Sequence, residues 1–241
     1  SYKHGEFVGE DGYRKEASAS GWYAPAMNIH RTPFAGRNFE YYSEDGFISG
    51  VMGTEAVKAT AKKGMYSFIK HFALNDQEDN RTSNGLATWC NEQAMREIYL
   101  KPFQMCVEDR GTVATRVLEY TEVVNEVTQE SEWKFIEKTV DVPACLAVMS
   151  SFNRIGYTWA GGDYRLLTEV LRNEWGFNGM VLTDYDNGGY MEKHQMVRAG
   201  GDAALKQYGG SNININNDAT RYHTQQAIKH ILYTVVNSNG M

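Results

Sequence analysis

Four apolar runs of strand length are spread along the chain, and they constrain its fold more than any other feature. They cover residues 21–27, 66–72, 145–151 and 179–184. Each run is continuous rather than alternating, which is typical of strands buried on both faces of a parallel sheet. A weaker fifth candidate lies at 203–205. The sequence therefore predicts a set of buried parallel strands.

Helical patterns separate these runs. Residues 55–63 are rich in Ala and Lys, and residues 92–107 carry apolar side chains at helical spacing. Asp163 is placed to cap a third helix, and Gly176 is placed to end it. The apolar face of that helix would consist of Leu166, Leu167, Val170 and Leu171. With a further helix at 219–236, strands alternate with helices, which indicates a parallel α/β sheet or barrel.

The number of strands is small for a closed barrel. The 241 residues fit one domain, because α/β barrels reach about 250 residues. A closed barrel of this kind has about eight strands, and only four or five are found here. Part of the length is taken up by residues 110–143, a polar, charge-mixed stretch without a continuous apolar run. We interpret it as a surface insertion with a helix at 114–127.

Composition and charge exclude several classes of partner. The formal net charge is -6, with 24 Lys and Arg against 30 Asp and Glu, so the clustered positive charge that nucleic-acid binding needs is absent. No apolar run approaches the roughly 20 residues of a membrane-spanning helix, so no membrane partner is expected. The three cysteines, Cys90, Cys106 and Cys145, are scattered and lack metal-ligand spacing. We therefore expect no metal and no cofactor.

Polar side chains end each apolar run. In parallel α/β folds the functional site lies at the carboxyl ends of the strands, so these residues are the candidates. Taken singly they have structural interpretations: Asp184 can cap a helix, Arg37 and Glu40 can form a surface ion pair, and Met149 can fill a core. Together, one carboxylate, several cations, a His and aromatic rings suit a neutral ligand rich in hydroxyl groups. The candidates are Arg37, Lys70, His71, Arg81, Met149, Phe152, Asp184 and Tyr185.

Five motifs follow one another along the chain. They are Gly36-Arg37-Asn38-Phe39-Glu40 with Ser43-Glu44-Asp45; Lys70-His71-Phe72 followed by Arg81; Arg96-Glu97-Ile98-Tyr99-Leu100-Lys101-Pro102-Phe103; Val148-Met149-Ser150-Ser151-Phe152-Asn153; and Trp175-Gly176-Phe177-Asn178-Gly179 ending in Thr183-Asp184-Tyr185. In this order they resemble the barrel domain of glycoside hydrolase family 3, in its β-glucosidase branch. The resemblance extends from about Gly21 to Met241 and is interrupted only by residues 110–143. The segment 73–81 contains no His, which disfavours the branch that cleaves N-acetylglucosaminides.

The resemblance implies a role for each candidate. Asp184 matches the catalytic nucleophile, and Tyr185 stands where the family has Trp. Met149 and Phe152 match residues that line the sugar site, with Phe152 in the place of a Tyr. The residues that match those holding the sugar hydroxyls are Arg37, Lys70, His71 and Arg81.

These roles imply a retaining exo-β-glycosidase, most simply a β-glucosidase that releases terminal β-linked glucose. Its substrate would be a β-glucoside or a short β-linked oligosaccharide, cleaved by double displacement through a glycosyl-Asp184 intermediate. The chemistry is consistent, because cations beside Asp184 favour its charged form and Lys and Arg donate to hydroxyl groups.

Part of the family's machinery has no counterpart in this sequence. The family's barrel starts upstream of Ser1, and its general acid/base Glu comes from a separate α/β sandwich domain. We therefore expect residues 1–241 to be a partial barrel domain that folds against remaining segments of the same enzyme, in the same or a separate chain. Glu40, Glu44 and Glu78 are not assigned as the acid.

Other functions remain open at this stage. The specificity could be that of a β-xylosidase or another family 3 glycosidase, or the chain could be a non-catalytic sugar-binding barrel that lacks its acid. A lyase from another class could use Lys70 to form a Schiff base, since a buried Lys is a common barrel nucleophile. The sequence leaves the aglycone, the oligomeric state and the compartment undetermined.

Overall fold

The structure, a computed structural model, describes residues 1–14, 19–81, 84–124, 127–128, 131–186, 189–206 and 213–239. The α-helices are α1 (Tyr2–Arg14), α2 (Gly46–Ala61), α3 (Glu92–Ala94), α4 (Lys101–Glu108), α5 (Lys193–Ala199) and α6 (Asp218–Val236). The π-helical segments are η2 (Met95–Tyr99) and η4 (Arg165–Glu174), and the 3₁₀ turns are η1 (Asn38–Glu40) and η3 (Ala160–Gly162). The strands are β1 (Gly21–Trp22), β2 (Tyr66–Phe72), β3 (Ala87–Thr88), β4 (Arg110–Val124), β5 (Ser131–Pro143), β6 (Ala147–Ser150), β7 (Arg154–Ile155), β8 (Thr158–Trp159), β9 (Met180–Tyr185) and β10 (Ala203–Leu205).

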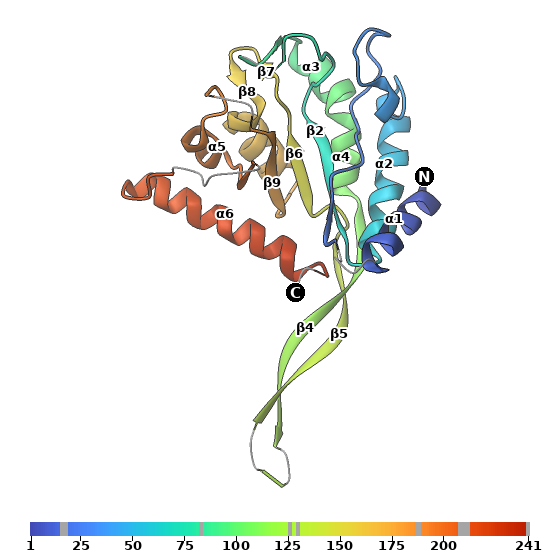
Figure 1. Ribbon diagram of the computed structural model, residues 1–241, viewed down its shortest axis with the longest axis vertical. Helices are drawn as coiled ribbons and strands as arrows, with labels where there is room; N and C mark the ends of the chain where they lie inside the picture. The colour runs from blue at the N-terminus through green and yellow to red at the C-terminus, as the bar shows by residue number, and fades with distance from the viewer. Residues whose placement is uncertain are drawn as a thin grey trace.

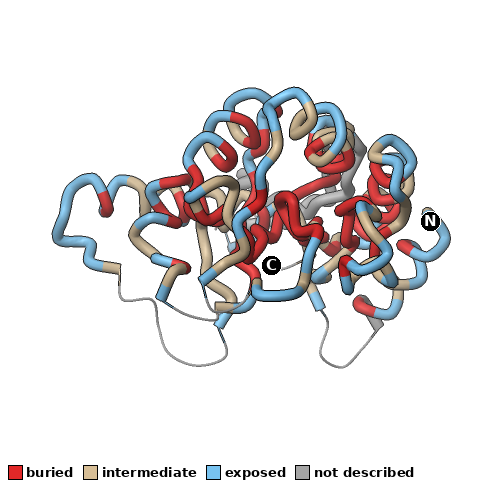
Figure 2. The backbone as a smooth tube through the Cα atoms, turned by 90° about the horizontal axis from the view of Figure 1, so that it is seen from above, coloured by how far each residue is buried: buried red, intermediate tan, exposed pale blue. Residues whose placement is uncertain are grey.

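The main sheet has five parallel strands in the order β1-β2-β6-β9-β10. They overlap the four apolar runs and the weaker fifth candidate, so a strand is confirmed in each. In the run 21–27 the strand covers only Gly21–Trp22, and Ala26 adds an isolated parallel bridge to Lys70. The sheet curls, and helices form an arc along one side of it while buried residues gather between them (Figures 1 and 2). This arrangement is part of a (β/α)₈ TIM-like barrel, as predicted.

Neighbouring residues on each strand pack on opposite sides of the sheet. Ile69, Val148 and Val181 belong to the large buried cluster shared with α2, α4 and η4. Phe68 and Met149 belong to a separate, smaller cluster on the inner side. Because successive side chains on a strand point to opposite faces, the continuous apolar runs are explained by burial on both faces.

Most helix predictions hold, with changes at the ends. Helix α2 starts at Gly46 rather than at residue 55, because the Asp45 side chain accepts a hydrogen bond of 2.8 Å from the Ile48 N–H. The predicted helix 92–107 is divided into α3, η2 and α4. Asp163 accepts a 3.0 Å hydrogen bond from the Arg165 N–H at the start of η4, and Gly176 takes a positive φ of 71° just after its end.

The prediction of a helix at 114–127 is wrong. Strands β4 and β5 pair as an antiparallel ribbon with Arg110 opposite Pro143 and Val117 opposite Ile136, and the ribbon projects away from the barrel (Figure 1). Continuous apolar runs mark strands that are buried on both faces of a sheet, whereas a two-stranded antiparallel ribbon can mix β-branched residues with polar ones. The limits of the insertion, 110–143, agree with the structure.

The two ends of the partial barrel differ. At the amino ends of the strands, the Thr234 hydroxyl of α6 accepts a 2.9 Å bond from the Met180 N–H and donates a 2.7 Å bond to the Leu146 carbonyl. Helix α6 therefore ties the starts of β6 and β9. At the opposite end a small sheet, β3-β7-β8, follows the main strands. Within the described residues, no helix has the length and apolar character needed to cross a membrane.

Candidate active site

Asp184 lies near the carboxyl end of β9 and is 9% exposed. Its Oδ1 accepts a 2.7 Å hydrogen bond from the Tyr185 N–H. Its Oδ2 is 3.7 Å from Nε2 of His71 and 3.9 Å from Nη1 of Arg81, and it makes no hydrogen bond within the described part of the chain. Asp184 thus has one oxygen held by the backbone and one buried oxygen without a hydrogen bond.

Burial is the main influence on the charge of Asp184. It raises the pKa of the carboxyl, whereas the Tyr185 N–H and the positive charges of Arg81, Arg37 and Lys70 lower it. The net pKa lies above the ordinary value for Asp. From the sequence we expected the flanking cations to keep Asp184 ionised at neutral pH; in the structure they offset part of the cost of burial.

The three predicted cations are linked by two glutamates. Glu40 is ion-paired with Arg37, and its Oε2 is 3.2 Å from Nζ of Lys70. Glu78 lies 3.3 Å from Nη1 of Arg37 and 2.7 Å from Nε of Arg81. All five side chains are 16–23% exposed, so the pairs are more than the surface contacts considered for Arg37 and Glu40. The network fixes the direction of each cation.

His71 is fully enclosed and lies between the cations and Asp184. Burial lowers its pKa well below the ordinary value, and Lys70, Arg37 and Arg81 lower it further, so the imidazole is neutral. Its Nε2 is 3.4 Å from Nη2 of Arg37. The side-chain amide of Asn28 accepts a 2.7 Å bond from the His71 N–H and donates a 3.0 Å bond to its carbonyl, which fixes the backbone at this point.

Phe152 and Arg81 are stacked. The guanidinium carbon of Arg81 is 4.3 Å from the centre of the Phe152 ring, and Phe152 is buried among Trp159, Met191 and Met196. The stack gives the site an apolar wall and directs the cation toward Asp184.

The remaining two candidates lie around this group. Met149 is opposite Leu182 in the β6–β9 register, and both lie in the inner cluster. Asp184 is two residues beyond Leu182, so Met149 lies below it on the same face of the sheet. Tyr185 is 44% exposed and contacts Asp184 through its backbone. The structure thus gathers Arg37, Lys70, His71, Arg81, Phe152 and Asp184 into one network, with Met149 beneath it.

Two residues of this network were not singled out from the sequence. Glu78 and Arg81 have the i, i+3 spacing of a local ion pair, which is a signal that could have been used. Asn28 follows the first apolar run, but its bonds to His71 join residues 43 positions apart and have no local signal.

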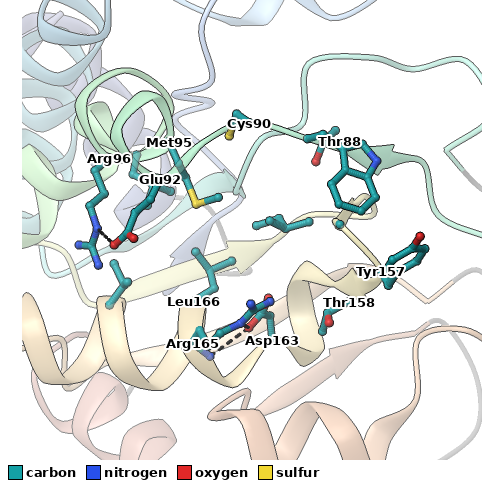
Figure 3. A pocket seen from close by; sticks show the side chains of 15 residues that line it. Thr88, Cys90, Glu92, Met95, Arg96, Tyr157, Thr158, Asp163, Arg165 and Leu166 are labelled. Atoms are coloured by element: carbon teal, nitrogen blue, oxygen red, sulfur yellow. Dashed lines mark hydrogen bonds and ion pairs between the residues drawn. The ribbon is translucent and has the colours of Figure 1, made fainter.

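Two hollows in the described part of the chain differ in their relation to the network. One of about 300 Å³ is lined by Lys70, Glu40, Trp22 and Tyr23, among others, and lies beside the network. The other, of about 570 Å³, lies near the small sheet between η2 and η4, and its lining includes the ion pairs Arg96–Glu92 and Arg165–Asp163 (Figure 3). None of the eight candidates lines this larger hollow. Within the described part of the chain, no cluster of His, Cys, Asp and Glu is arranged to hold a metal ion.

Comparison with known proteins decides the family. The model of the glycosyl hydrolase family 3 N-terminal domain matches residues 8–133 and 116–238, which together cover most of the chain. This chain belongs to glycosyl hydrolase family 3. It is 35% identical over 204 residues to beta-glucosidase A of Butyrivibrio fibrisolvens, covering 85% of this chain and 20% of that protein.

Other family 3 proteins are similarly related. A beta-glucosidase of Ruminococcus albus is 31% identical over 232 residues, which are 90% of this chain and 21% of that protein. The structure of beta-glucosidase 3B from Thermotoga neapolitana in complex with glucose matches with a TM-score of 0.71 and 30% identity, covering 99% of this chain and 30% of that chain. This family 3 chain thus spans about a fifth of the length of these two curated relatives.

Proposed function

We propose that this chain carries the nucleophile and most of the sugar-binding residues of a retaining exo-β-glycosidase, a β-glucosidase. The observation that carries the proposal is Asp184 at a strand end, with a buried Oδ2 that lacks a hydrogen bond and faces His71 and Arg81. The relatives named beta-glucosidase support the choice of a β-glucoside as substrate.

The cations bind and orient the sugar. Lys70, Arg37 and Arg81 offer N–H groups and no acceptors, so they bind hydroxyl oxygens in a fixed direction. Glu40 and Glu78 hold these side chains in place. Bonds to the hydroxyl next to the anomeric carbon strengthen as positive charge develops on the ring.

The chemistry has two displacements. Oδ2 of Asp184 forms a bond to the anomeric carbon while the bond to the aglycone oxygen breaks and that oxygen takes a proton from an acid. Water then attacks the anomeric carbon of the glycosyl ester, gives its proton back to the same group, and releases Asp184 as the carboxylate. Configuration at the anomeric carbon is retained, because each displacement inverts it.

The acid and the rest of the barrel come from other segments of the enzyme. In the part of the chain that the structure describes, the main sheet has five strands, whereas a closed barrel has about eight. The relatives are also several times longer than this chain. We assign residues 1–241 as a partial barrel domain and place the acid Glu on an α/β sandwich domain, with its carboxyl about 5 to 5.5 Å from Asp184.

A Schiff-base lyase is disfavoured by the environment of Lys70. A Schiff base forms from a neutral amine, whereas the Lys70 ammonium is ion-paired with Glu40 at 3.2 Å. Borohydride trapping with a carbonyl substrate therefore leaves no adduct on Lys70.

The test uses the full-length enzyme and an aryl β-glucoside. Wild type releases β-glucose first, seen by NMR of the anomeric proton. The Asp184→Asn variant folds and binds glucose but loses several orders of magnitude in kcat, because the covalent route is deleted. Asp218→Asn, on an exposed carboxyl at the start of α6, is the matched control and keeps full activity. Near-normal turnover by Asp184→Asn, or α-glucose as first product, contradicts the proposal.

A further inference from the structure

Tyr190 lies in the segment after β9 and is in contact with two other strand-end loops. Its hydroxyl is 3.2 Å from the carbonyl oxygen of Phe152 and 3.3 Å from that of Arg81. These two residues are 71 positions apart and come from the loops that follow β6 and β2. A single phenol therefore joins the backbones of the two residues that stack beside Asp184.

The ring of Tyr190 also contacts neighbouring side chains. The guanidinium carbon of Arg154 is 5.3 Å from the ring centre, and the ring of Trp159 meets it edge-on at 6.4 Å. Arg154 itself donates from Nε to the Asn84 carbonyl at 2.7 Å. Gly85 has a φ of +73°, and a Cβ there would lie 2.9 Å from Cε2 of Tyr190. Arg154 and Tyr190 thus contact Asn84 and Gly85, which lie a few positions after Arg81 in the sequence.

The contacts continue from Tyr190 to the reacting carboxylate. Arg81 lies 4.3 Å above the Phe152 ring, and its Nη1 is 3.9 Å from Oδ2 of Asp184. Burial raises the pKa of the Tyr190 phenol to about 12, so the group stays protonated and donates at working pH. Neither the family resemblance nor the chemistry above gives this residue a role.

We propose that Tyr190 is a positioning residue of the glycosidase site: its hydroxyl holds the Arg81 and Phe152 backbones so that the Arg81 guanidinium stays on the Phe152 ring and faces Asp184. The inference rests on the proposed function and extends it to the loop after β9.

The test compares Tyr190→Phe with wild type in the full-length enzyme. Loss of this partly buried hydrogen bond lowers kcat/KM for an aryl β-glucoside about three- to tenfold. Because Arg81 is one of the charges that lower the pKa of Asp184, together with Arg37 and Lys70, its displacement moves the acid limb of the kcat/KM profile to higher pH. Because His71 is neutral, it adds no charge that would change the pKa of Asp184.

Two controls separate positioning from a general structural effect. Tyr157→Phe removes a phenol that is 85% exposed on the small sheet, and it leaves both kcat/KM and the acid limb unchanged. In an Arg81→Ala background, Tyr190→Phe has little further effect on kcat/KM if Tyr190 acts through Arg81.

The outcomes are distinguishable. The positioning role is overturned if the effects of Tyr190→Phe and Arg81→Ala on kcat/KM are fully additive, or if Tyr190→Phe leaves the acid limb unchanged, even when wild type is active. An inactive wild-type enzyme overturns the proposed function instead. A Tyr190→Phe protein that melts well below wild type is replaced by Gly85→Ala, whose Cβ would lie 2.9 Å from Cε2 of Tyr190 and 3.1 Å from the Phe152 carbonyl oxygen. This variant disturbs the same Tyr190–Phe152 contact and must reproduce the shift of the acid limb.

Discussion

Glu40 offers the sharpest test of the ion-pair network. Its two carboxylate oxygens bind Arg37 and, at 3.2 Å, Lys70, and its side chain is 18% exposed. Glu40→Gln keeps the shape and one acceptor oxygen but removes the charge, and with it the ion pairs to both Arg37 and Lys70. A hydrogen bond to a charged group is worth about 1.5 to 3 kcal/mol. Because the side chain is partly exposed to solvent, we expect the loss of transition-state binding free energy to lie near the lower limit of this range. The value of kcat/KM therefore falls about tenfold.

The same variant changes the pH dependence. Removing the negative charge leaves Arg37 and Lys70 less compensated, and both act to lower the pKa of Asp184. The folded-state pKa of Asp184 therefore falls, and the acid limb of kcat/KM moves to lower pH, the direction opposite to that expected for Tyr190→Phe. The assay is aryl β-glucoside hydrolysis by the full-length enzyme across the acid range. Glu44→Gln, an exposed residue four positions away, is the control. An unchanged kcat/KM in Glu40→Gln, or an acid limb that moves to higher pH, refutes the network as described.

Three further changes have defined outcomes. Lys70→Ala weakens transition-state binding by about 2 to 4 kcal/mol, measured through kcat/KM, because a charged donor that is only 16% exposed is lost. Exposed Lys3→Ala has no such effect, and equal values for the two variants mean that Lys70 does not bind substrate. Asp202→Asn lowers the free energy of unfolding by about 3 kcal/mol, because Asp202 pairs with Arg172 at 2.8 Å and accepts a 2.7 Å hydrogen bond from the Val181 N–H. Hydrogen exchange at the Val181 amide must become faster. Gly85→Ala lowers kcat/KM about tenfold because its Cβ contacts Tyr190, whereas Gly156→Ala, also at positive φ but beside Trp89, leaves kcat/KM unchanged. Equal losses in the two variants argue for backbone strain alone.

The strands and most helices could be predicted from the sequence because their signals are local. The run at residues 145–151 is apolar throughout since its side chains are buried on both faces of the sheet, as Val148 and Met149 show. The ribbon β4–β5 could not be found in the same way. Its strands pair only with each other, so the continuous apolar pattern that marks a buried strand is not required.

The sequence could predict which residues form the site but not how their side chains contact one another. Strand-end position and family resemblance named Asp184, Arg37 and Arg81. The contacts that orient them come from segments far apart in sequence: Glu78 joins Arg37 over 41 positions, and Tyr190 joins Arg81 over 109. The balance of burial against charge at Asp184 also depends on packing around the folded strand, which no local pattern encodes.

The proposed mechanism requires Asp184 to form a covalent bond to the sugar. The reagent is a β-glucoside with fluorine in place of the 2-hydroxyl and with an activated leaving group. The fluorine slows both displacements, whereas the leaving group speeds the first, so the covalent intermediate accumulates. After incubation of the full-length enzyme, digestion and mass spectrometry should show one fluoroglucosyl group on the peptide that contains Met180–Tyr185, with fragmentation placing it on Asp184. A label on any other residue, or complete turnover without a labelled peptide, would contradict the assignment.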